Sequence, residues 1–456
     1  MTNIPNSWAV VPIVDVLEPN ENGKPFQQGW SPQCESHPAS VEKWGVLKTT
    51  AIQPGEFRDH ENKQLPDGLE PRPHIEVREG DLLMTCAGPR ARCGVVCLVE
   101  RTRSKLMMSG KMYRFRSNAE VMNPHFLAYF IQSRSAQVAI DGMKTGISDS
   151  GLNLTHDRFA TLAVPVAPPP EQRRIVARIE ELFSELDKGV ESLTTVRQQL
   201  AAYKQSLLDK HFASSGEFKS LPSLLKVPMS NGYSGKPVKS EAEFKVLSLS
   251  ATTTGVFQPQ HFKYLDEAGL EQRDIWCEPE DILVQRGNTP EYVGVPAIYT
   301  GEANEFIFPD LMIRLRSNRD QVLPNYLYYA LSSPRIRNYL RVRAKGSAGT
   351  MPKISQAILS SVQIPYCGLP QQDEIVRNLD REFSRVAALE QTLEEQARKA
   401  SALRLATLQR AFSGRLVPQN LVDEPASVLL ERIRAEREEG DTAKRRNNKN
   451  GKKEAA

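Results

Sequence analysis

The sequence predicts a mixed α/β (α+β) fold, in which two similar globular domains are separated by two long helices. These helices are expected to pair as an antiparallel intramolecular coiled coil with pseudo-two-fold symmetry. Three observations predict this organisation. The chain of 456 residues repeats itself at a constant spacing of 200 residues. Each repeat begins with a segment of mixed composition that contains turn signals, and each then passes through a proline-rich hinge into a helix of roughly 40 residues.

The register of the repeat holds without a shift over some 165 residues. Val46-Leu47 returns as Val246-Leu247, and Asp81 returns as Asp281. Solenoid units run to roughly 20–50 residues, so this period indicates a duplicated domain that carries its own long helix. We expect five segments with these bounds: a first mixed domain 1–168, a first spacer helix 169–215, a second mixed domain 216–368, a second spacer helix 369–416, and a short helix with a disordered basic tail 417–456.

Short elements of the mixed domains are predicted in matching pairs. Residues 112–116 alternate apolar and basic side chains at period two, and residues 312–316 do the same. This alternation predicts half-buried strands with a basic outer row. Short helices are predicted to open at Pro124 and Pro324, because proline suits the first helical position.

The two long helices each follow a hinge that ends in proline, at Pro170 and at Pro370. The first helix carries a heptad seam, with apolar side chains at Ile179, Leu186, Leu193, Leu200 and Leu207. The second helix, about 371–413, has a weaker seam. Pairing of the two helices within one chain avoids a bimolecular entropy cost. The alternative is a coiled coil between two chains.

Composition and charge exclude several classes of protein. No apolar run is long enough to span a membrane, and the N-terminus has no secretory pattern. The six cysteines form no paired framework, which favours a reduced, cytoplasmic location. Cys93 and Cys97 resemble half of a metal site, but buried apolar cysteines are the favoured interpretation. Residues 441–456 account for the whole net charge of +4, so any DNA-binding face depends on how charge is arranged.

The sequence lacks the motifs of catalysis. It contains no phosphate-binding loop of the Gly-x-x-x-x-Gly-Lys-Ser/Thr type and no recognisable methyl-donor site. The seven histidines are scattered without metal-ligand spacing. We therefore expect a chain that is not an enzyme, has no catalytic residues and binds no metal or cofactor itself.

The duplicated layout resembles the specificity subunit of type I restriction–modification enzymes. The resemblance rests on the order of the hinges, the long helices, the paired segments Gly80-Asp81-Leu82-Leu83 and Glu280-Asp281-Ile282-Leu283, and the late segment 424–433. It implies that the mixed domains are target-recognition domains, each reading one half of a split double-stranded DNA target. It also implies two adenine-methyltransferase subunits and restriction/translocase subunits as partners, with S-adenosylmethionine, ATP and Mg bound by those partners. The helices would then set the gap between the half-sites.

Candidate base-reading residues lie in two loops that differ between the repeats. They are Arg90 and Arg92 in the first loop, and Gln285, Arg286 and Asn288 in the second. Arginine suits guanine edges, whereas asparagine and glutamine suit adenine.

Candidate phosphate contacts are the residues that the repeats share, or that lie in loops of small side chains. They are Arg114, Arg116, Arg314 and Arg316 on the predicted strands, and Lys144, Thr145, Lys345 and Ser347 in the loops. The alternatives are a solvated strand face and ordinary surface loops. Two other functions also fit the sequence: a protein scaffold with two binding domains on a coiled-coil spacer, and an autonomous DNA-binding regulator.

Overall fold

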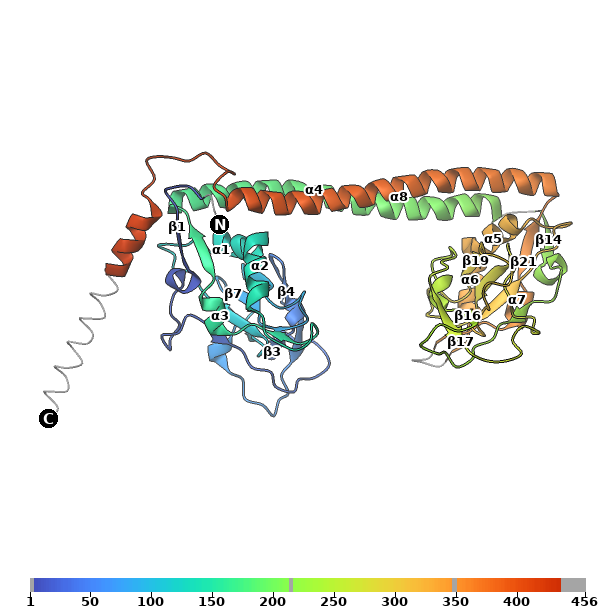
Figure 1. Cartoon of the computed structure of the whole chain (residues 1–456), viewed down its shortest axis with the longest axis horizontal. Coiled ribbons are helices and arrows are strands. Elements are labelled where there is room, and N and C mark those ends of the chain that lie inside the picture. Colours follow the sequence, from blue (N-terminus) through green and yellow to red (C-terminus); the bar gives the residue numbers. More distant parts are fainter. Residues whose placement is uncertain (1–3, 213–215, 347–350, 436–456) are drawn as a thin grey trace. The chain divides into compact units, whose positions relative to one another are not determined.

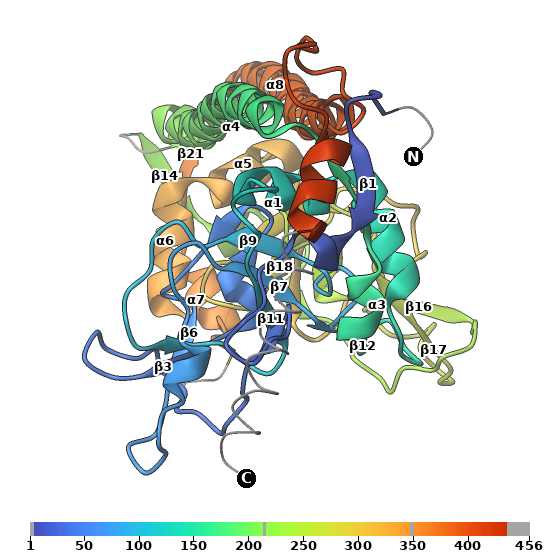
Figure 2. The same ribbon diagram turned by 90° about the vertical axis from the view of Figure 1, so that its left-hand side faces the viewer.

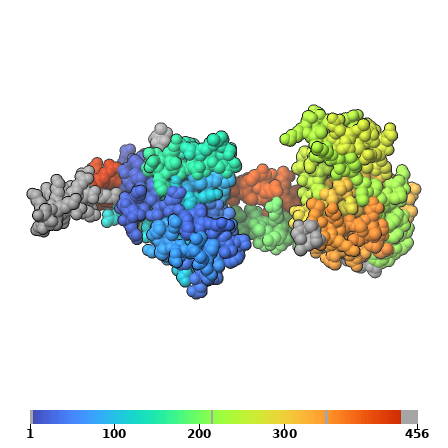
Figure 3. All heavy atoms as spheres, turned by 90° about the horizontal axis from the view of Figure 1, so that it is seen from below, coloured from blue at the N-terminus to red at the C-terminus, as the bar shows by residue number. Residues whose placement is uncertain are grey.

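A computed structural model describes residues 4–212, 216–346 and 351–435 of the chain. The chain divides into two compact units, Met1–Glu191 with Ala397–Ala456, and Ser192–Gln396. Each unit contains one mixed domain and part of each long helix (Figure 1). In the space-filling view, the residues of the first mixed domain gather into one body, coloured blue to teal (Figure 3).

The first mixed domain is built around an antiparallel four-stranded sheet of order β2-β11-β7-β9. Smaller sheets pair β10-β3-β6, β1-β13, β12-β8 and β4-β5. Its strands are β1 (Ala9–Pro12), β2 (Gln27–Gln28), β3 (Gly45–Leu47), β4 (Ile52–Gln53), β5 (Glu56–Phe57), β6 (Asn62–Gln64), β7 (Leu82–Thr85), β8 (Ala87–Gly88), β9 (Val96–Leu98), β10 (Leu106–Met107), β11 (Met112–Phe115), β12 (Leu152–Asn153) and β13 (Ala163–Val166). Its helices are α1 (Pro124–Gln132), α2 (Arg134–Met143) and α3 (His156–Ala160).

The second mixed domain repeats this plan with an antiparallel sheet of order β15-β20-β18-β19. Strands β14 and β21 pair with each other, as do β16 and β17. Its strands are β14 (Glu217–Ser220), β15 (Ser230–Asn231), β16 (Phe244–Leu247), β17 (Phe262–Leu265), β18 (Ile282–Gln285), β19 (Pro296–Ile298), β20 (Met312–Leu315) and β21 (Gln363–Tyr366), and its helices are α5 (Pro324–Ser332), α6 (Pro334–Arg343) and α7 (Gln356–Ser360). The strands predicted at 112–116 and 312–316 and the helices predicted at Pro124 and Pro324 are confirmed.

The central strand of each domain separates two hydrophobic cores. Leu82 and Met84 of β7 pack into one core, whereas Leu83 between them packs into the other. In the second domain, Ile282 and Val284 of β18 pack into one core, and Leu283 packs into the other. Side chains alternate between the faces of a strand, so a strand buried on both faces supplies two cores. Each sheet is therefore an inner layer of its domain.

The long helices are α4 (Pro169–Phe212) and α8 (Leu369–Ala411). Figures 1 and 2 show their ribbons side by side. In the first unit, Arg404 of α8 forms an ion pair with Asp187 of α4. In the second unit, Lys204 pairs with Glu390 at 2.9 Å, and Arg197 with Glu394 at 3.3 Å. Residue numbers rise along one helix as they fall along the other, so the predicted antiparallel pairing within one chain is confirmed.

A buried glutamine at the start of each long helix joins it to its mixed domain. The Gln172 side chain accepts a hydrogen bond from the Asn123 backbone N–H at 2.7 Å and donates to the carbonyls of Val121 and Ala167. Gln372 makes the same three bonds in the second unit, with Leu323, Gln321 and Cys367. Both side chains belong to residues with no exposed surface. Each glutamine thus fixes the helix to the turn that precedes α1 or α5.

The end of each long helix also packs on a mixed domain through a phenylalanine. In the first unit, Phe412 lies edge-on to Phe126 and Phe130 of α1, with ring centroids 5.1 Å and 5.4 Å away. In the second unit, Phe212 lies edge-on to Tyr326 of α5 at 5.2 Å. Each domain is therefore in contact with both helices of its unit.

The segment after α8 folds onto the first domain. Residues 426–435 are helical, and Ala426, Leu430 and Ile433 are buried in that domain's core. The Ala426 backbone N–H donates to the Ser7 carbonyl at 2.9 Å, and Arg434 pairs with Asp15 at 2.8 Å. The expected short helix is confirmed over these residues, and it adds to the first domain. The predicted basic tail lies outside the described residues.

Candidate nucleic-acid interface

A buried carboxylate lies at the start of the central strand in each domain. The Asp81 carboxylate accepts the Arg78 backbone N–H at 2.8 Å and the Arg116 Nε at 2.7 Å. The Asp281 carboxylate accepts the Glu278 N–H at 2.8 Å and two bonds from Arg316, at 2.7 Å and 2.8 Å. Neither aspartate side chain is exposed. These pairs stabilise the charge of two carboxylates that burial would otherwise penalise.

Arg114 and Arg314, two residues before the arginines that hold the aspartates, are drawn inward. The Arg314 side chain is 1% exposed and binds both carboxylate oxygens of Asp274, at 2.8 Å and 2.7 Å. These hydrogen bonds hold the pKa of Asp274 below its ordinary value. Arg114 donates to the carbonyls of Glu76 and His74. The predicted basic outer row is therefore wrong at these two positions, because a neighbouring loop covers the strand face.

The inward placement of Arg314 bears on its candidate role in binding phosphate. Contact of Arg114, Arg116, Arg314 and Arg316 with phosphate stays a prediction. The structure gives Arg314 almost no surface for such a contact, whereas Arg116 has a side chain that is 45% exposed.

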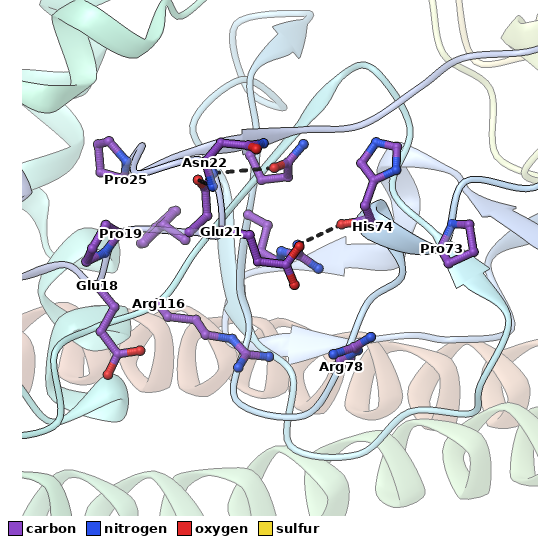
Figure 4. A pocket seen from close by; sticks show the side chains of 13 residues that line it. Glu18, Pro19, Glu21, Asn22, Pro25, Pro73, His74, Arg78 and Arg116 are labelled. Atoms are coloured by element: carbon purple, nitrogen blue, oxygen red, sulfur yellow. Dashed lines mark hydrogen bonds between the residues drawn. The ribbon is translucent and has the colours of Figure 1, made fainter. Parts of the chain in front are cut away.

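A polar recess lies beside the arginines of the first domain. It has a volume of about 230 Å³. Figure 4 shows the guanidinium groups of Arg78 and Arg116 in this recess together with the carboxylates of Glu18 and Glu21. Arg114 also lines the recess, so both signs of charge are present there.

The second domain has a corresponding recess, of about 620 Å³, with the charges of one pair exchanged. Lys226 and Glu278 lie where the first recess has Glu18 and Arg78. The backbone confirms this equivalence, because the N–H of Glu18 donates to Arg116 and the N–H of Lys226 donates to Arg316. The two domains therefore carry charges of opposite sign at each of these two equivalent positions.

The two candidate DNA-binding loops of the first domain form one site. Strand β8 pairs with β12, and Thr145 pairs with Asn153 on the other side of β12. Arg90 binds Asp141 at 2.6 Å and Asp149 at 3.0 Å, and the Lys144 Nζ donates to the Arg90 carbonyl at 3.0 Å. The loop with the candidate base readers and the loop with the candidate phosphate contacts therefore share one edge.

The second domain joins its two candidate loops in the same way. Gly287 pairs with Lys353, which pairs in turn with Lys345. The Ile354 N–H donates to the Arg286 carbonyl at 2.8 Å, and the Asn288 N–H donates to the Pro352 carbonyl at 3.3 Å. We define the edge row of each domain as these three residues: Ala87, Asn153 and Thr145 in the first domain, and Gly287, Lys353 and Lys345 in the second.

The five candidate base readers differ in accessibility. Gln285 has no exposed surface, and its amide donates to the Leu249 carbonyl at 2.8 Å and to the Thr252 hydroxyl at 2.6 Å. Arg92 is directed inward and donates to the carbonyls of Thr49 and Ile52. Both side chains therefore link segments within their own domains. Arg90 is exposed, whereas Arg286 and Asn288 are half-buried, as Arg92 is. Arg286 also donates to the Asp310 carbonyl at 3.1 Å, and the Asn288 amide donates to the Gln285 side chain at 3.3 Å. Arg90, Arg286 and Asn288 lie beside the edge row and retain surface for a ligand.

Among the candidate phosphate contacts in the loops, Thr145 and Lys345 belong to the edge rows. Lys144 has only 5% of its side chain exposed and is occupied by Asp141. Ser347 lies outside the described residues. Sequence reasoning missed Asn153 and Lys353, which complete the rows. The only sequence signal for Lys353 is its positive charge at the position that Asn153 holds 200 residues earlier.

Other kinds of site find no support in the described parts of the chain. No group of three or more histidine, cysteine, aspartate or glutamate side chains there is placed to hold a metal ion. Burial raises the pKa of Cys97 to about 12, and Cys93 is likewise buried with a raised pKa. No described helix has the length and apolar character that crossing a membrane requires.

Comparison with known proteins identifies relatives of both halves of the chain. Residues 269–399 match the family model described as the type I restriction modification DNA specificity domain. The type I restriction enzyme EcoEI specificity subunit of Escherichia coli is 36% identical over 182 residues, which are 40% of this chain and 31% of that protein. The EcoKI specificity subunit of E. coli strain K12 is 25% identical over 335 residues, or 68% of this chain and 71% of the relative. The match therefore spans 31% of the EcoEI subunit and 71% of the EcoKI subunit.

A solved structure supports the fold over most of the chain. A chain determined in a study of complex assembly and conformational transition of the type I R-M system aligns with a TM-score of 0.68 at 21% identity, covering 91% of this chain and 100% of that one. The duplicated domains, the paired long helices and these similarities agree. The chain is therefore similar to type I restriction–modification specificity subunits, and its residues 269–399 match the DNA specificity domain of that family.

Proposed function

We propose that this chain recognises double-stranded DNA, each mixed domain reading one half of a bipartite target. The observation that carries the proposal is the duplicated edge row. The two domains share a framework of buried aspartates, glutamines and strands, yet the exposed residues on and beside the edge row differ between them. A framework shared by both domains, with different exposed side chains, is the arrangement expected of two domains that read different bases.

In this proposal the chain is a non-catalytic subunit of a larger complex. It positions two adenine-methyltransferase subunits and the restriction/translocase subunits on DNA. S-adenosylmethionine, ATP and Mg are used by those partners. The support comes from the relatives, all of which are named specificity subunits of type I restriction enzymes.

Substitution of one candidate base-reading arginine in each domain tests the reading of half-sites. We expect Arg286→Ala to relax base preference in one half of the target, and Arg90→Ala to relax it in the other half. Loss of one good bidentate base contact costs about 1–3 kcal/mol of discrimination. The measurement is selection of bound duplexes from a random library by the full chain with its methyltransferase. Uniform weakening across all sequences would instead identify a phosphate contact.

The same experiment separates the rival functions. A protein scaffold would select no DNA sequence. An autonomous regulator would bind its target with full affinity when the methyltransferase is left out. Recognition that depends on the assembled complex supports the proposal.

We further propose that the length of the paired helices sets the unread gap between the half-sites. One heptad added to α4 and one to α8, at facing positions, extends each helix by about 10 Å. Since base pairs are stacked at about 3.4 Å, the gap should grow by about three base pairs while both half-sites stay the same. Altered half-sites at an unchanged gap would contradict this role of the helices.

A further inference from the structure

Two lysines face each other in the edge row of the second domain. The backbone N–H groups of Lys345 and Lys353 each donate to the carbonyl of the other residue at 2.9 Å. Directly opposed residues of an antiparallel pair place their side chains on the same face, with Cβ atoms about 4.5–5.5 Å apart. Both lysines are exposed. Gly287 completes the row, and its missing side chain leaves space for Lys353, whose Cγ is 3.1 Å from where a Cβ would lie.

This arrangement is unfavourable for the free protein. Like charges directly opposite each other destabilise a strand pair. Within the parts of the second unit that the structure describes, no carboxylate forms an ion pair with Lys345 or Lys353. A pair of uncompensated cations at a fixed separation suits a ligand that brings its own negative charges.

Further cations lie next to the lysine pair, at the end of helix α6. Arg341 and Arg343 occupy its last turn and are exposed. Arg343 lies over the Tyr339 ring at 3.8 Å. Burial, and then the charge of nearby Arg341, lower the pKa of Arg337 to about 10. The helix C-terminus favours cations there, which explains the two arginines of the last turn but does not explain the lysines.

The first domain provides an internal comparison, because it has none of these charges at the matching positions. Asp141 and Met143 occupy the end of α2, and Thr145 and Asn153 lie in the edge row. The neighbouring Lys144 is neutralised by Asp141, at 2.9 Å. The same fold therefore forms without the cations, so their presence in the second domain is not a requirement of the fold.

We propose that Lys345 and Lys353 of the second domain together bind the DNA phosphate backbone, so that this domain supplies more of the salt-dependent affinity than the first. The inference rests on the proposed function and deepens it. Two features favour duplex DNA over other anions. Its phosphates form a regular row of single charges. In addition, the candidate base readers Arg286 and Asn288 lie beside the lysines, so a duplex bound there by its phosphates could present a base edge to them. The first domain, with Thr145 and Asn153, would depend more on uncharged contacts.

The test uses a double variant, Lys345→Thr with Lys353→Asn, which gives the second domain the residues of the first. The full-length chain, assembled with its methyltransferase, is titrated with a long mixed-sequence DNA duplex at several salt concentrations. Each neutralised phosphate contributes about 0.9 to the slope of log affinity against log salt. We therefore expect the slope of the double variant to be shallower by about 1.8. The control is Lys239→Asn with Lys263→Thr, which removes two other exposed lysines of the same domain and should leave the slope unchanged.

Each outcome decides between the explanations. An unchanged slope for the edge-row variant, or an equal decrease for the control, overturns the inference while the proposed function stands. If the variant keeps its slope but binds a methyltransferase subunit less tightly, the row is a protein-docking surface and the inference is again wrong. If the unaltered chain, assembled with its methyltransferase, fails to bind duplex at low salt, the proposed function itself fails. Thermal unfolding of both variants shows whether the folded state is intact.

Discussion

Replacement of Phe412 by alanine tests how the end of α8 stabilises the first unit. Phe412 is 7% exposed and forms edge-on ring pairs with Phe126 and Phe130. Loss of a buried phenylalanine ring costs about 3–5 kcal/mol. Each aromatic pair contributes about 0.5–1.5 kcal/mol beyond its buried area, which places this site in the upper part of that range. The conservative Phe412→Leu retains apolar volume and should cost roughly 1.5 kcal/mol or less.

The tryptophans allow the effect to be assigned to one unit. Trp8 lies 6.0 Å from Phe126 in the first unit, and Trp276 lies in the second unit against Phe244. In a chain labelled with fluorotryptophan, the ¹⁹F resonance of each ring can be followed through a denaturant titration. We expect Phe412→Ala to lower the midpoint reported by Trp8 and to leave that of Trp276 in place. The reciprocal Phe212→Ala should lower the midpoint of Trp276. Equal shifts at both tryptophans, or no shift at Trp8, would refute the reasoning.

Two further predictions concern the buried polar groups that the repeats share. Gln172→Ala and Gln372→Ala each leave three backbone groups without their hydrogen-bond partners. We expect the free energy of unfolding of the corresponding unit to fall by about 1–3 kcal/mol, as measured by the same denaturant titration. Variants as stable as the unaltered chain would argue against this role of the glutamines. Arg316→Ala leaves the Asp281 carboxylate buried without its cation and should cost about 3–5 kcal/mol. Arg90→Ala removes only the exposed ion pairs with Asp141 and Asp149 and should cost much less; similar losses for the two variants would count against the distinction.

Local sequence patterns were sufficient to predict the long helices and several short elements. The heptad positions and the prolines at Pro170 and Pro370 act within a few residues of one another, so they can be read from the chain directly. The same holds for the period-two strands at 112–116 and 312–316. Duplication strengthened each of these predictions, because the same signal occurred twice.

The exposure of individual side chains could not be predicted in this way. Arg314 looks like a surface residue in its strand, but Asp274, which is 40 residues earlier, draws it inward. Gln285 ends its strand as a loop residue would, yet Thr252 and Leu249 hold it in the interior. The edge row depends on pairing of Lys353 with both Gly287 and Lys345. Such contacts are set by the packing of segments that are distant in sequence.

The pattern of bases that the assembled chain selects is the most direct test of recognition by two separate domains. Selection from a random duplex library, with sequencing of the bound fraction, measures this pattern. We predict two short specified segments separated by a fixed stretch in which any base is accepted, with Arg90 and Arg286 each affecting a different segment. One contiguous motif, or no motif at all, would contradict recognition by two separate domains.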